Sequence, residues 1–294
     1  MKVAITSDLH VDHHPEVSSL VLAEVLRRTD GAGADLLIIA GDLTHHEDRL
    51  EQALATMRPA ARAAVFVAGN HDLWVKKDPT EPTSRDRYER IVPDRARAAG
   101  FHAVGAGSLV VDGFRIVGVT GWYDYTLRNR ELDHVFAMDD YRRGSWGRLR
   151  WNDKLHIVWP GDDGDLLDDT AICAAQIRSL ESQLDADPTT PTIVVTHHLP
   201  FQSLTTSKGE PPWDFLNGFM GSAHLGEAIL RTPGVRLAVA GHTHFRKSAV
   251  LDGAGGPGNP VRAEVSPIGY PREYRRGQQD LPSRVADRVL LLDV

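Results

Sequence analysis

The sequence has 294 residues, of which 41% are hydrophobic and 25% are charged, and its net charge is −7. This acidic balance argues against a protein that coats nucleic acids or binds anionic membranes. The single cysteine, Cys173, excludes an internal disulfide framework and a thiolate-rich zinc site, and a chain of this length can bury a full core without such cross-links.

The sequence contains no run of about 18 apolar residues, which is the length that a membrane-spanning helix needs. Its first residues, Met1–Ile5, lead directly into a strand pattern and lack the charged and apolar regions of a signal peptide. We therefore expect a cytoplasmic protein that does not contact membranes. We expect no nucleic-acid partner, and the sequence carries no signal for an oligomeric state.

Short apolar runs, several of them rich in β-branched residues, predict strands that are buried on both faces. These runs are Val3–Thr6, Leu36–Ala40, Ala64–Ala68, Phe114–Thr120, Thr192–Thr196, Arg236–Ala240 and Arg288–Asp293. Helical spacing of apolar residues predicts helices at Pro15–Thr29, Glu47–Met57, Arg85–Ala99, Asp168–Leu184 and Ser222–Leu230. The alternation predicts an α/β core. In the C-terminal third we expect further strands joined by Gly/Pro turns.

Two long segments lack a clean periodicity. Trp122–Asp165 is rich in Trp, Tyr, Arg and Asp, and Pro200–Gly221 is a long stretch with two consecutive prolines inside it. Long loops within compact domains are usually functional. We therefore expect a single domain over residues 1–294, with a cap-like or pocket-lining insertion around 122–165.

Polar residues that can bind metals follow five of the predicted strands. Because ligand sites in open α/β sheets lie at the carboxyl ends of strands, these residues are expected to meet at one edge. They occur in Ser7-Asp8-Leu9-His10, Gly41-Asp42, Gly69-Asn70-His71-Asp72, His197-His198 and Gly241-His242-Thr243-His244.

The residue types in these blocks predict a metal centre. Carboxylate, amide and imidazole ligands without thiolate suit Mn, Fe, Zn, Co or Ni. The blocks offer seven candidate ligands: Asp8, His10, Asp42, Asn70, His242, His244 and one of the adjacent His197 and His198. Seven ligands are too many for one four-coordinate ion, but they fit two ions that share a carboxylate, for which Asp42 is the natural candidate. The glycines before Asp42, Asn70 and His242 allow sharp turns and a close approach of the metals.

A pair of ions about 3.5–4 Å apart is suited to displacement at phosphorus, because it binds the phosphoryl oxygens and lowers the pKa of a bound water toward about 7. The departing oxygen then needs a proton. His71 follows Asn70 directly and is the predicted general acid.

Taken together and in this order, the five blocks resemble the calcineurin-like metallophosphoesterases, and the resemblance covers nearly the whole chain. It implies a four-layer α/β/β/α sandwich of two facing mixed sheets, with a dinuclear metal site at the carboxyl edge of the strands. It also implies that Asp72 orients His71, and that His197 rather than the adjacent His198 is a ligand.

The resemblance further implies a division of the ligands between two divalent ions. One ion takes Asp8, His10, Asp42 and His244. The other takes Asp42, Asn70, His197 and His242.

Residues near these blocks are candidates for substrate binding, each with a structural alternative. Trp122 and Tyr123 either line a pocket or pack a loop onto the core. Arg272 either reaches a substrate phosphate or is a turn residue. Four histidines that follow the ligand blocks either contact a phosphate or lie in solvated loops: His13, His14, His45 and His46, with His45 retained as the candidate.

The leading hypothesis is a metal-dependent phosphoesterase that hydrolyses a small phosphomonoester or phosphodiester by attack of a metal-bound hydroxide. One alternative is a nuclease of the same superfamily, which the acidic balance and the lack of a long basic stripe disfavour. The other is a non-catalytic interaction module on the same fold, which the complete set of ligands and His71 disfavour.

Overall fold

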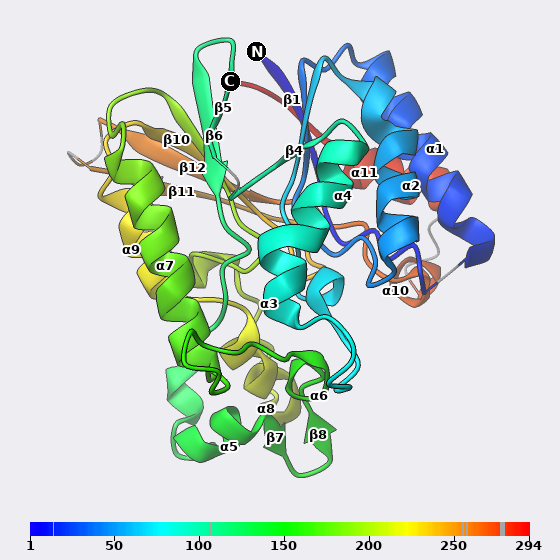
Figure 1. The fold of residues 1–294 in the computed structure, drawn as a ribbon. Coiled ribbons are helices and arrows are strands. Elements are labelled where there is room, and N and C mark those ends of the chain that lie inside the picture. Colours follow the sequence, from blue (N-terminus) through cyan, green and yellow to red (C-terminus); the bar gives the residue numbers. More distant parts are fainter. Residues whose placement is uncertain (14, 106, 255, 257, 277–279) are drawn as a thin grey trace.

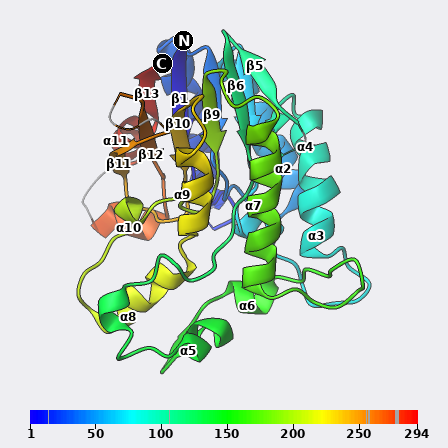
Figure 2. The same ribbon diagram turned by 90° about the vertical axis from the view of Figure 1, so that its left-hand side faces the viewer.

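A computed structural model describes residues 1–294 except 14, 106, 255, 257 and 277–279. Two mixed β-sheets lie face to face, and helices cover the outer face of each, which gives the predicted four-layer α/β/β/α arrangement (Figure 1; Figure 2 gives the perpendicular view). Both chain termini lie at the end of the sheets opposite the helices α5 (Met138–Arg143) and α6 (Asp153–His156). The fold class predicted from the sequence is confirmed.

The first sheet has the strand order β13-β1-β2-β3-β4 and is parallel except at β13. Its strands are β1 (Lys2–Thr6), β2 (Leu36–Ile39), β3 (Ala63–Phe66), β4 (His102–Ala103) and β13 (Leu290–Asp293). The helices on its outer face are α1 (Pro15–Gly31), α2 (Glu47–Met57), α3 (Ser84–Asp86), α4 (Val92–Ala98), α10 (Pro271–Arg276) and α11 (Leu281–Arg288).

The second sheet has the order β11-β12-β10-β9-β6-β5, with parallel pairing from β12 to β6 and an antiparallel strand at each edge. Its strands are β5 (Leu109–Val111), β6 (Phe114–Gly118), β9 (Thr192–Val195), β10 (Val235–Ala240), β11 (Lys247–Asp252) and β12 (Pro260–Val265). The helices α7 (Asp169–Asp185) and α9 (Ala223–Leu230) pack on its outer face.

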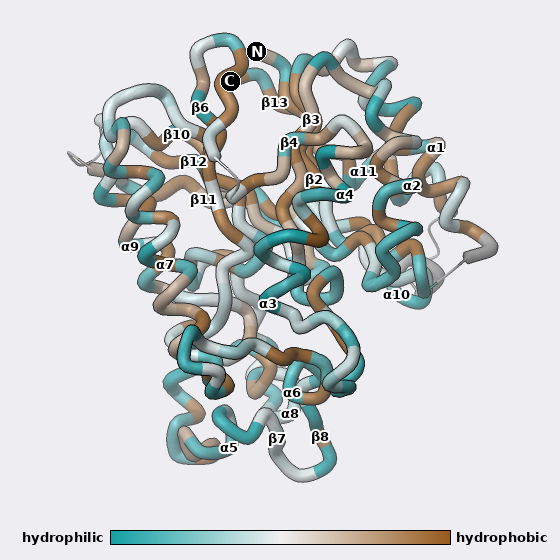
Figure 3. Tube along the Cα trace, viewed as in Figure 1, coloured by the Kyte–Doolittle hydropathy of each residue, from teal (hydrophilic) through white to brown (hydrophobic). Residues whose placement is uncertain are grey.

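Alternation along the strands builds three apolar layers. Ile5 and Ile38 of the first sheet pack between the sheets with Ile193 and Val239 of the second, whereas Ala4, next to Ile5, faces the helices outside. Because both faces of the central strands are covered, the strands are apolar throughout, as the brown tube segments of Figure 3 show. This explains why the sequence showed runs rather than alternation.

Three predictions about secondary structure need correction. The predicted helix Arg85–Ala99 contains a π-helical turn, Arg87–Ile91, before α4; Pro93, near the start of α4, lacks the N–H that a regular α-helical hydrogen bond requires. The predicted strand Arg288–Asp293 begins only at Leu290, since Arg288 ends the helix α11. After the predicted helix Ser222–Leu230, strands joined by turns were expected, but α10 and α11 also lie in this part of the chain.

The segments 122–165 and 200–221 lie side by side beyond the carboxyl ends of the strands (Figures 1 and 2). The first carries α5, the hairpin of β7 (Ser145–Trp146) and β8 (Leu149–Arg150), and α6, and the second carries α8 (Pro211–Asp214). The buried Asp214 joins them, because its carboxylate accepts hydrogen bonds from the Asn129 side chain and from the backbone N–H groups of Lys208 and Gly209.

Single turns of 3-10 helix complete the described structure, at Arg58–Ala60, His71–Leu73, Arg130–Leu132, Gln202–Leu204 and Phe215–Phe219. Within the described ranges, no helix combines the length and the apolar character that crossing a membrane requires.

Candidate metal centre

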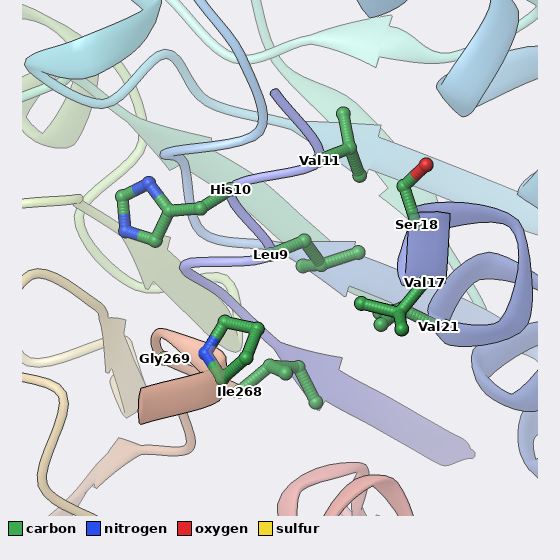
Figure 4. Close-up of a pocket in the computed structure, with 9 residues that line it drawn as sticks. Leu9, His10, Val11, Val17, Ser18, Val21, Ile268 and Gly269 are labelled. Carbon is green, nitrogen blue, oxygen red and sulfur yellow. The ribbon is translucent and has the colours of Figure 1, made fainter. Parts of the chain in front are cut away.

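The predicted ligands come from the carboxyl ends of strands in both sheets. Asp8 follows β1, Asp42 follows β2 and Asn70 follows β3, while His197 and His242 follow the neighbouring strands β9 and β10. Figure 4 shows how one such segment divides its side chains: Leu9 and Val11 turn toward α1, and the imidazole of His10 turns to the opposite side. Each segment thus packs on the core while presenting its polar side chain to the shared edge.

A first cluster consists of Asp8, His10 and His244, whose candidate ligand atoms all lie within 4.8 Å of one another. The Nε2 atoms of the two histidines are 3.0 Å apart, and Nε2 of His244 is 3.3 Å from Oδ1 of Asp8. On its other side, Nδ1 of His244 is 3.1 Å from both carboxylate oxygens of Glu273. A carboxylate behind a ligating imidazole fixes the ring and raises its basicity.

A second cluster consists of Asp42, His197 and His242, which are all buried. Nε2 of His197 lies 3.2 Å from Nδ1 of His242, 3.1 Å from Oδ1 of Asn70 and 3.4 Å from Oδ1 of Asp42. His197 is oriented by the carbonyl of Ala40, 2.8 Å from its Nδ1. All four predicted ligands of this ion therefore converge on one point.

Asp42 lies between the two clusters. Its Oδ1 faces His197, and its Oδ2 lies 3.8 Å from Nε2 of His10. One carboxylate thus directs an oxygen toward each group of ligands, as a bridging ligand must. Several lone pairs converge in each cluster with too few protons to pair them, and this donor set of carboxylate, amide and imidazole fits a divalent transition-metal ion.

Backbone strain marks the same residues. Among the described non-glycine residues, those in the left-handed region are Asp8, His10, Asp42, Asp112, Tyr125, His242 and His244, with φ between 45° and 72°. Five of the seven are predicted ligands. Such conformations cost about 1–3 kcal/mol each and concentrate at functional sites, where the surrounding structure holds them in place.

Two glycines allow the strand ends to approach closely. A Cβ on Gly69 would lie 2.1 Å from Oδ1 of Asp42, and one on Gly41, where φ is +84°, would lie 2.5 Å from Nδ1 of His197. Any side chain at either position would therefore occupy space needed by the ligands. The glycines before Asp42 and Asn70 therefore allow the segments that carry these ligands to lie close together.

The histidines of the two clusters differ in proton affinity. Burial, followed by the nearby His71, holds the pKa of His10 well below its usual value, and burial together with His197 lowers the pKa of His242 to about 3. Burial also disfavours the charged form of His197 and His244. However, the Asp42 carboxylate raises the pKa of His197 to about 9, and hydrogen bonds to Asp8 and Glu273 raise that of His244 to about 10. A cation would displace protons held by such carboxylate–imidazole pairs.

His71 lies beside both clusters on the turn that follows Asn70. Its Nε2 is 3.9 Å from Oδ2 of Asp42 and 3.5 Å from the hydroxyl of Tyr270, and its ring stacks on Trp74 with centroids 3.7 Å apart. Burial lowers the pKa of His71 to about 4. Its Nδ1 has no hydrogen-bond partner within the described part of the chain.

Asp72 does not orient His71, contrary to the expectation from the resemblance. Its Oδ2 accepts from the backbone N–H groups of Asp42 and Gly69, and its Oδ1 accepts from those of Leu43 and Thr44, at 2.7–2.9 Å. Burial and the Asp42 carboxylate raise the pKa of Asp72 to about 7. Because both oxygens are engaged by backbone donors, Asp72 acts on the loop that carries Asp42.

Of the adjacent histidines, His197 belongs to the second cluster, whereas His198 packs against His242 with ring centroids 4.4 Å apart and has its Nδ1 3.4 Å from the carbonyl of Thr120. The candidate substrate residues are less centrally placed. Trp122 and Tyr123 are fully buried and stack on each other, so they pack the core rather than face an open pocket. His45 pairs with Asp12 at 2.5 Å.

Arg272 is exposed on α10, with its guanidinium 4.9 Å from the ring of Tyr270. Of the other loop histidines, His13 and His46 belong to the described residues and His14 does not. Three residues near the ligands were not expected. Tyr270 and Glu273 could have been found from the sequence, because they flank Pro271-Arg272, where a substrate contact was already considered. Asp153, which accepts a hydrogen bond from Asn70, has no neighbouring motif in the sequence that marks it.

Comparison with known proteins decides the family. A family model for calcineurin-like phosphoesterases matches residues 1–246. The chain belongs to the calcineurin-like phosphoesterase family. The resemblance is thereby confirmed, and so is the prediction of an enzyme that hydrolyses phosphoric esters. Calcineurin-like phosphoesterases use dinuclear metal sites, and the two clusters offer the ligand groups for one.

Individual relatives agree with this assignment. The chain is 24% identical over 279 residues to the acyl-carrier-protein phosphodiesterase PptH of Mycobacterium tuberculosis, covering 92% of this chain and 78% of that protein. The crystal structure of that phosphopantetheinyl hydrolase matches with a TM-score of 0.69 at 23% identity, covering 96% of this phosphoesterase and 94% of the other chain. A dimetal phosphatase from Danio rerio matches with a TM-score of 0.50 at 13% identity over 90% and 86% of the two chains.

Proposed function

We propose that this phosphoesterase hydrolyses a phosphodiester at two divalent transition-metal ions. The observation that carries the proposal is the position of Asp42, whose two oxygens face separate clusters. The N/O donor set suits Mn, Fe, Zn, Ni or Co. One ion is held by Asp8, His10, Asp42 and His244, and the other by Asp42, Asn70, His197 and His242.

When bound, such a pair of cations neutralises the phosphoryl oxygens and supplies an attacking water of lowered pKa. The protein holds the ligands in place before substrate arrives, through Glu273 behind His244 and the Ala40 carbonyl behind His197. His71, beside Asp42, donates a proton to the departing oxygen, as an anionic ester close to its ring favours the protonated imidazole.

The phenol of Tyr270 lies next to His71 and stacks on His10, with ring centroids 4.4 Å apart. Burial raises the pKa of Tyr270, so the group stays a neutral hydrogen-bond donor. It is placed to donate to the same ester. This gives the substrate two donors on the side of the site opposite the second cluster's histidines.

A phosphopantetheinylated acyl carrier protein is the first substrate to test. The support is the likeness to PptH, named as an acyl-carrier-protein phosphodiesterase, which in sequence covers 92% of this chain and 78% of that protein. A small phosphorylated metabolite is the alternative that the sequence suggested. The two substrate classes differ in size, so assays of a carrier protein and of small esters with the same enzyme preparation can distinguish them.

The test uses the full chain, stripped with a chelator and reloaded separately with Mn²⁺, Zn²⁺, Ni²⁺, Co²⁺ or Fe²⁺. Bound metal is counted by mass spectrometry. Hydrolysis is measured on p-nitrophenyl phosphate, bis(p-nitrophenyl) phosphate and, by intact mass, a phosphopantetheinylated carrier protein. We expect two cations per chain and metal-dependent cleavage of the diester and the carrier protein. A single bound cation, or two bound cations without cleavage of these substrates, would overturn the proposal. Nicking of plasmid DNA without cleavage of the carrier protein would indicate a nuclease.

A further inference from the structure

A buried carboxylate from the insertion reaches the candidate metal centre. Asp153 is the first residue of α6 and is only 2% exposed. Its Oδ1 accepts from Nδ2 of Asn70 at 2.8 Å and from Nε1 of Trp74 at 2.7 Å. Its Oδ2 accepts from Nε1 of Trp151 at 2.9 Å. Both oxygens are therefore engaged by donors, and all three donors belong to side chains at the site or against it.

The contact with Asn70 decides which end of its carboxamide faces the second cluster. A side-chain amide has an oxygen and an NH₂ group of nearly equal size, and only the oxygen can bind a cation. An ionised carboxylate accepts hydrogen bonds but cannot donate one, so Asp153 attracts Nδ2 of Asn70. Oδ1 of Asn70 then points the other way and lies 3.1 Å from Nε2 of His197.

The other two donors touch different site residues. Trp74 stacks on His71, and Trp151 lies edge-on to His242 with ring centroids 5.7 Å apart while stacking on Phe219. One carboxylate thus connects the insertion to three parts of the centre. Only the bond to Asn70, however, is made to the side chain of a predicted ligand.

We propose that Asp153 is a positioning residue that fixes the Asn70 carboxamide with its oxygen toward the ion held by Asp42, His197 and His242. This inference rests on the proposed two-ion function. It assigns the insertion a part in binding the second cation, in addition to any contact that it makes with substrate. Outer residues that orient metal ligands typically change metal affinity 10–100-fold when they are replaced.

The experiment compares full-length variants by calorimetric titration of cations into the chelator-treated protein, with thermal unfolding as a measure of structural damage. Asp153→Ala removes the acceptor, so we expect the affinity for one cation to fall 10–100-fold while the other is unchanged. Asp153→Asn keeps one oxygen that can accept from Nδ2, so we expect a change of less than about threefold. Asp139→Asn is the matched control, because it replaces another carboxylate of the segment 122–165, one that is 70% exposed and pairs with Arg142 rather than with a site residue.

A rescue variant separates orientation from general loosening of the structure. A carboxylate in place of Asn70 presents oxygen in either orientation, so Asn70→Asp should restore the lost affinity in the Asp153→Ala background without restoring the unfolding temperature. In the wild-type background the same change sets two carboxylates in contact and should lower the unfolding temperature. Because a carboxylate binds a cation more tightly than an amide in any background, the deciding comparison is the size of the gain: a purely structural role for Asp153 predicts the same gain from Asn70→Asp in both backgrounds, whereas orientation predicts a larger gain in the Asp153→Ala background.

The results distinguish this inference from the function on which it rests. A wild-type chain that binds fewer than two cations contradicts the proposed function. A wild-type chain that binds two, with both affinities unchanged in Asp153→Ala, contradicts the role of Asp153 alone. Should Asp153→Ala fail to fold, Asp153→Asn still decides, since a loss above tenfold there would show that orientation by an acceptor oxygen is not the cause.

Discussion

Replacement of Asp72 by Asn tests whether this residue supports the backbone or assists His71. Each carboxylate oxygen of Asp72 accepts from two backbone N–H groups, Asp42 and Gly69 at Oδ2 and Leu43 and Thr44 at Oδ1. An amide has only one oxygen. Whichever way it rotates, its NH₂ group faces two backbone donors, and these lose their acceptor in a fully buried place.

The structure sets the size of the effect. A buried donor left without a partner costs about 1–3 kcal/mol, so two of them cost about 2–6 kcal/mol. Removal of the buried negative charge beside Asp42 offsets part of this loss, so we expect the net effect in the lower half of that range. Whole domains are stable by only about 5–15 kcal/mol, so the loss is a large fraction of the total. We also expect weaker cation binding, because the strained Asp42 backbone, at φ 58°, is held by one of these bonds.

The free energy of unfolding is measured by urea titration at pH 8, after chelation, for the wild type and for Asp72→Asn. Asp139→Asn is the control, because that side chain is 70% exposed and pairs only with Arg142 among the described residues, and its effect should stay within about 0.5 kcal/mol. If Asp72→Asn changes stability by less than about 1 kcal/mol but slows turnover, the residue serves His71 after all and our reasoning is refuted.

Three further substitutions test separate parts of the site. Asp42→Ala should leave fewer than two cations in metal analysis and abolish turnover, and two cations with a normal rate would contradict the bridge. His71→Ala should retain both cations but slow alkyl esters more than p-nitrophenyl esters, and an equal loss for both would argue against proton donation. Asp214→Asn should lower the stability at pH 7 by about 1–3 kcal/mol in urea unfolding. Burial opposes ionisation of Asp214, but hydrogen bonds from Lys208, Ser207 and Asn129 bring its pKa below the usual value. The contribution is therefore complete above the unfolded pKa near 4 and is lost as the pH falls through the folded pKa, so the two proteins should converge in acid.

The parts of the site that could be predicted are those with a local cause. A strand buried on both faces is an apolar run, and a turn at its end requires glycine before a polar residue, so Gly41-Asp42 and Gly69-Asn70 were visible in the sequence. The same reasoning located His242 after Gly241, whereas the choice of His197 over the adjacent His198 came from the family resemblance. Helix ends were less predictable, because Pro93 lies within a segment whose apolar spacing is otherwise regular.

What could not be predicted are contacts between distant segments. Asn70 and Asp153 are 83 positions apart, and nothing near Asp153 indicates a partner. Trp122 and Tyr123 stand directly after a strand, where aromatic residues line a pocket or fill the core, and only their packing with distant side chains such as Phe219 decides for the core. The prediction that Asp72 orients His71 was wrong for the same reason. The backbone groups that Asp72 accepts from at Asp42–Thr44 follow another strand.

These distant contacts divide the support of the two clusters. In the first, Glu273 holds His244 from α10, an element near the C-terminus. In the second, Asp153 holds Asn70 from the insertion. Asp42, which faces both, is held through its backbone by Asp72, from the 3-10 turn that follows β3. The proposed bridging ligand therefore depends on a fully buried residue, whereas His244 and Asn70 depend on segments that lie outside the sheets. We therefore expect changes in the segment 122–165 to act on one of the two proposed cations while leaving Asp42 in place.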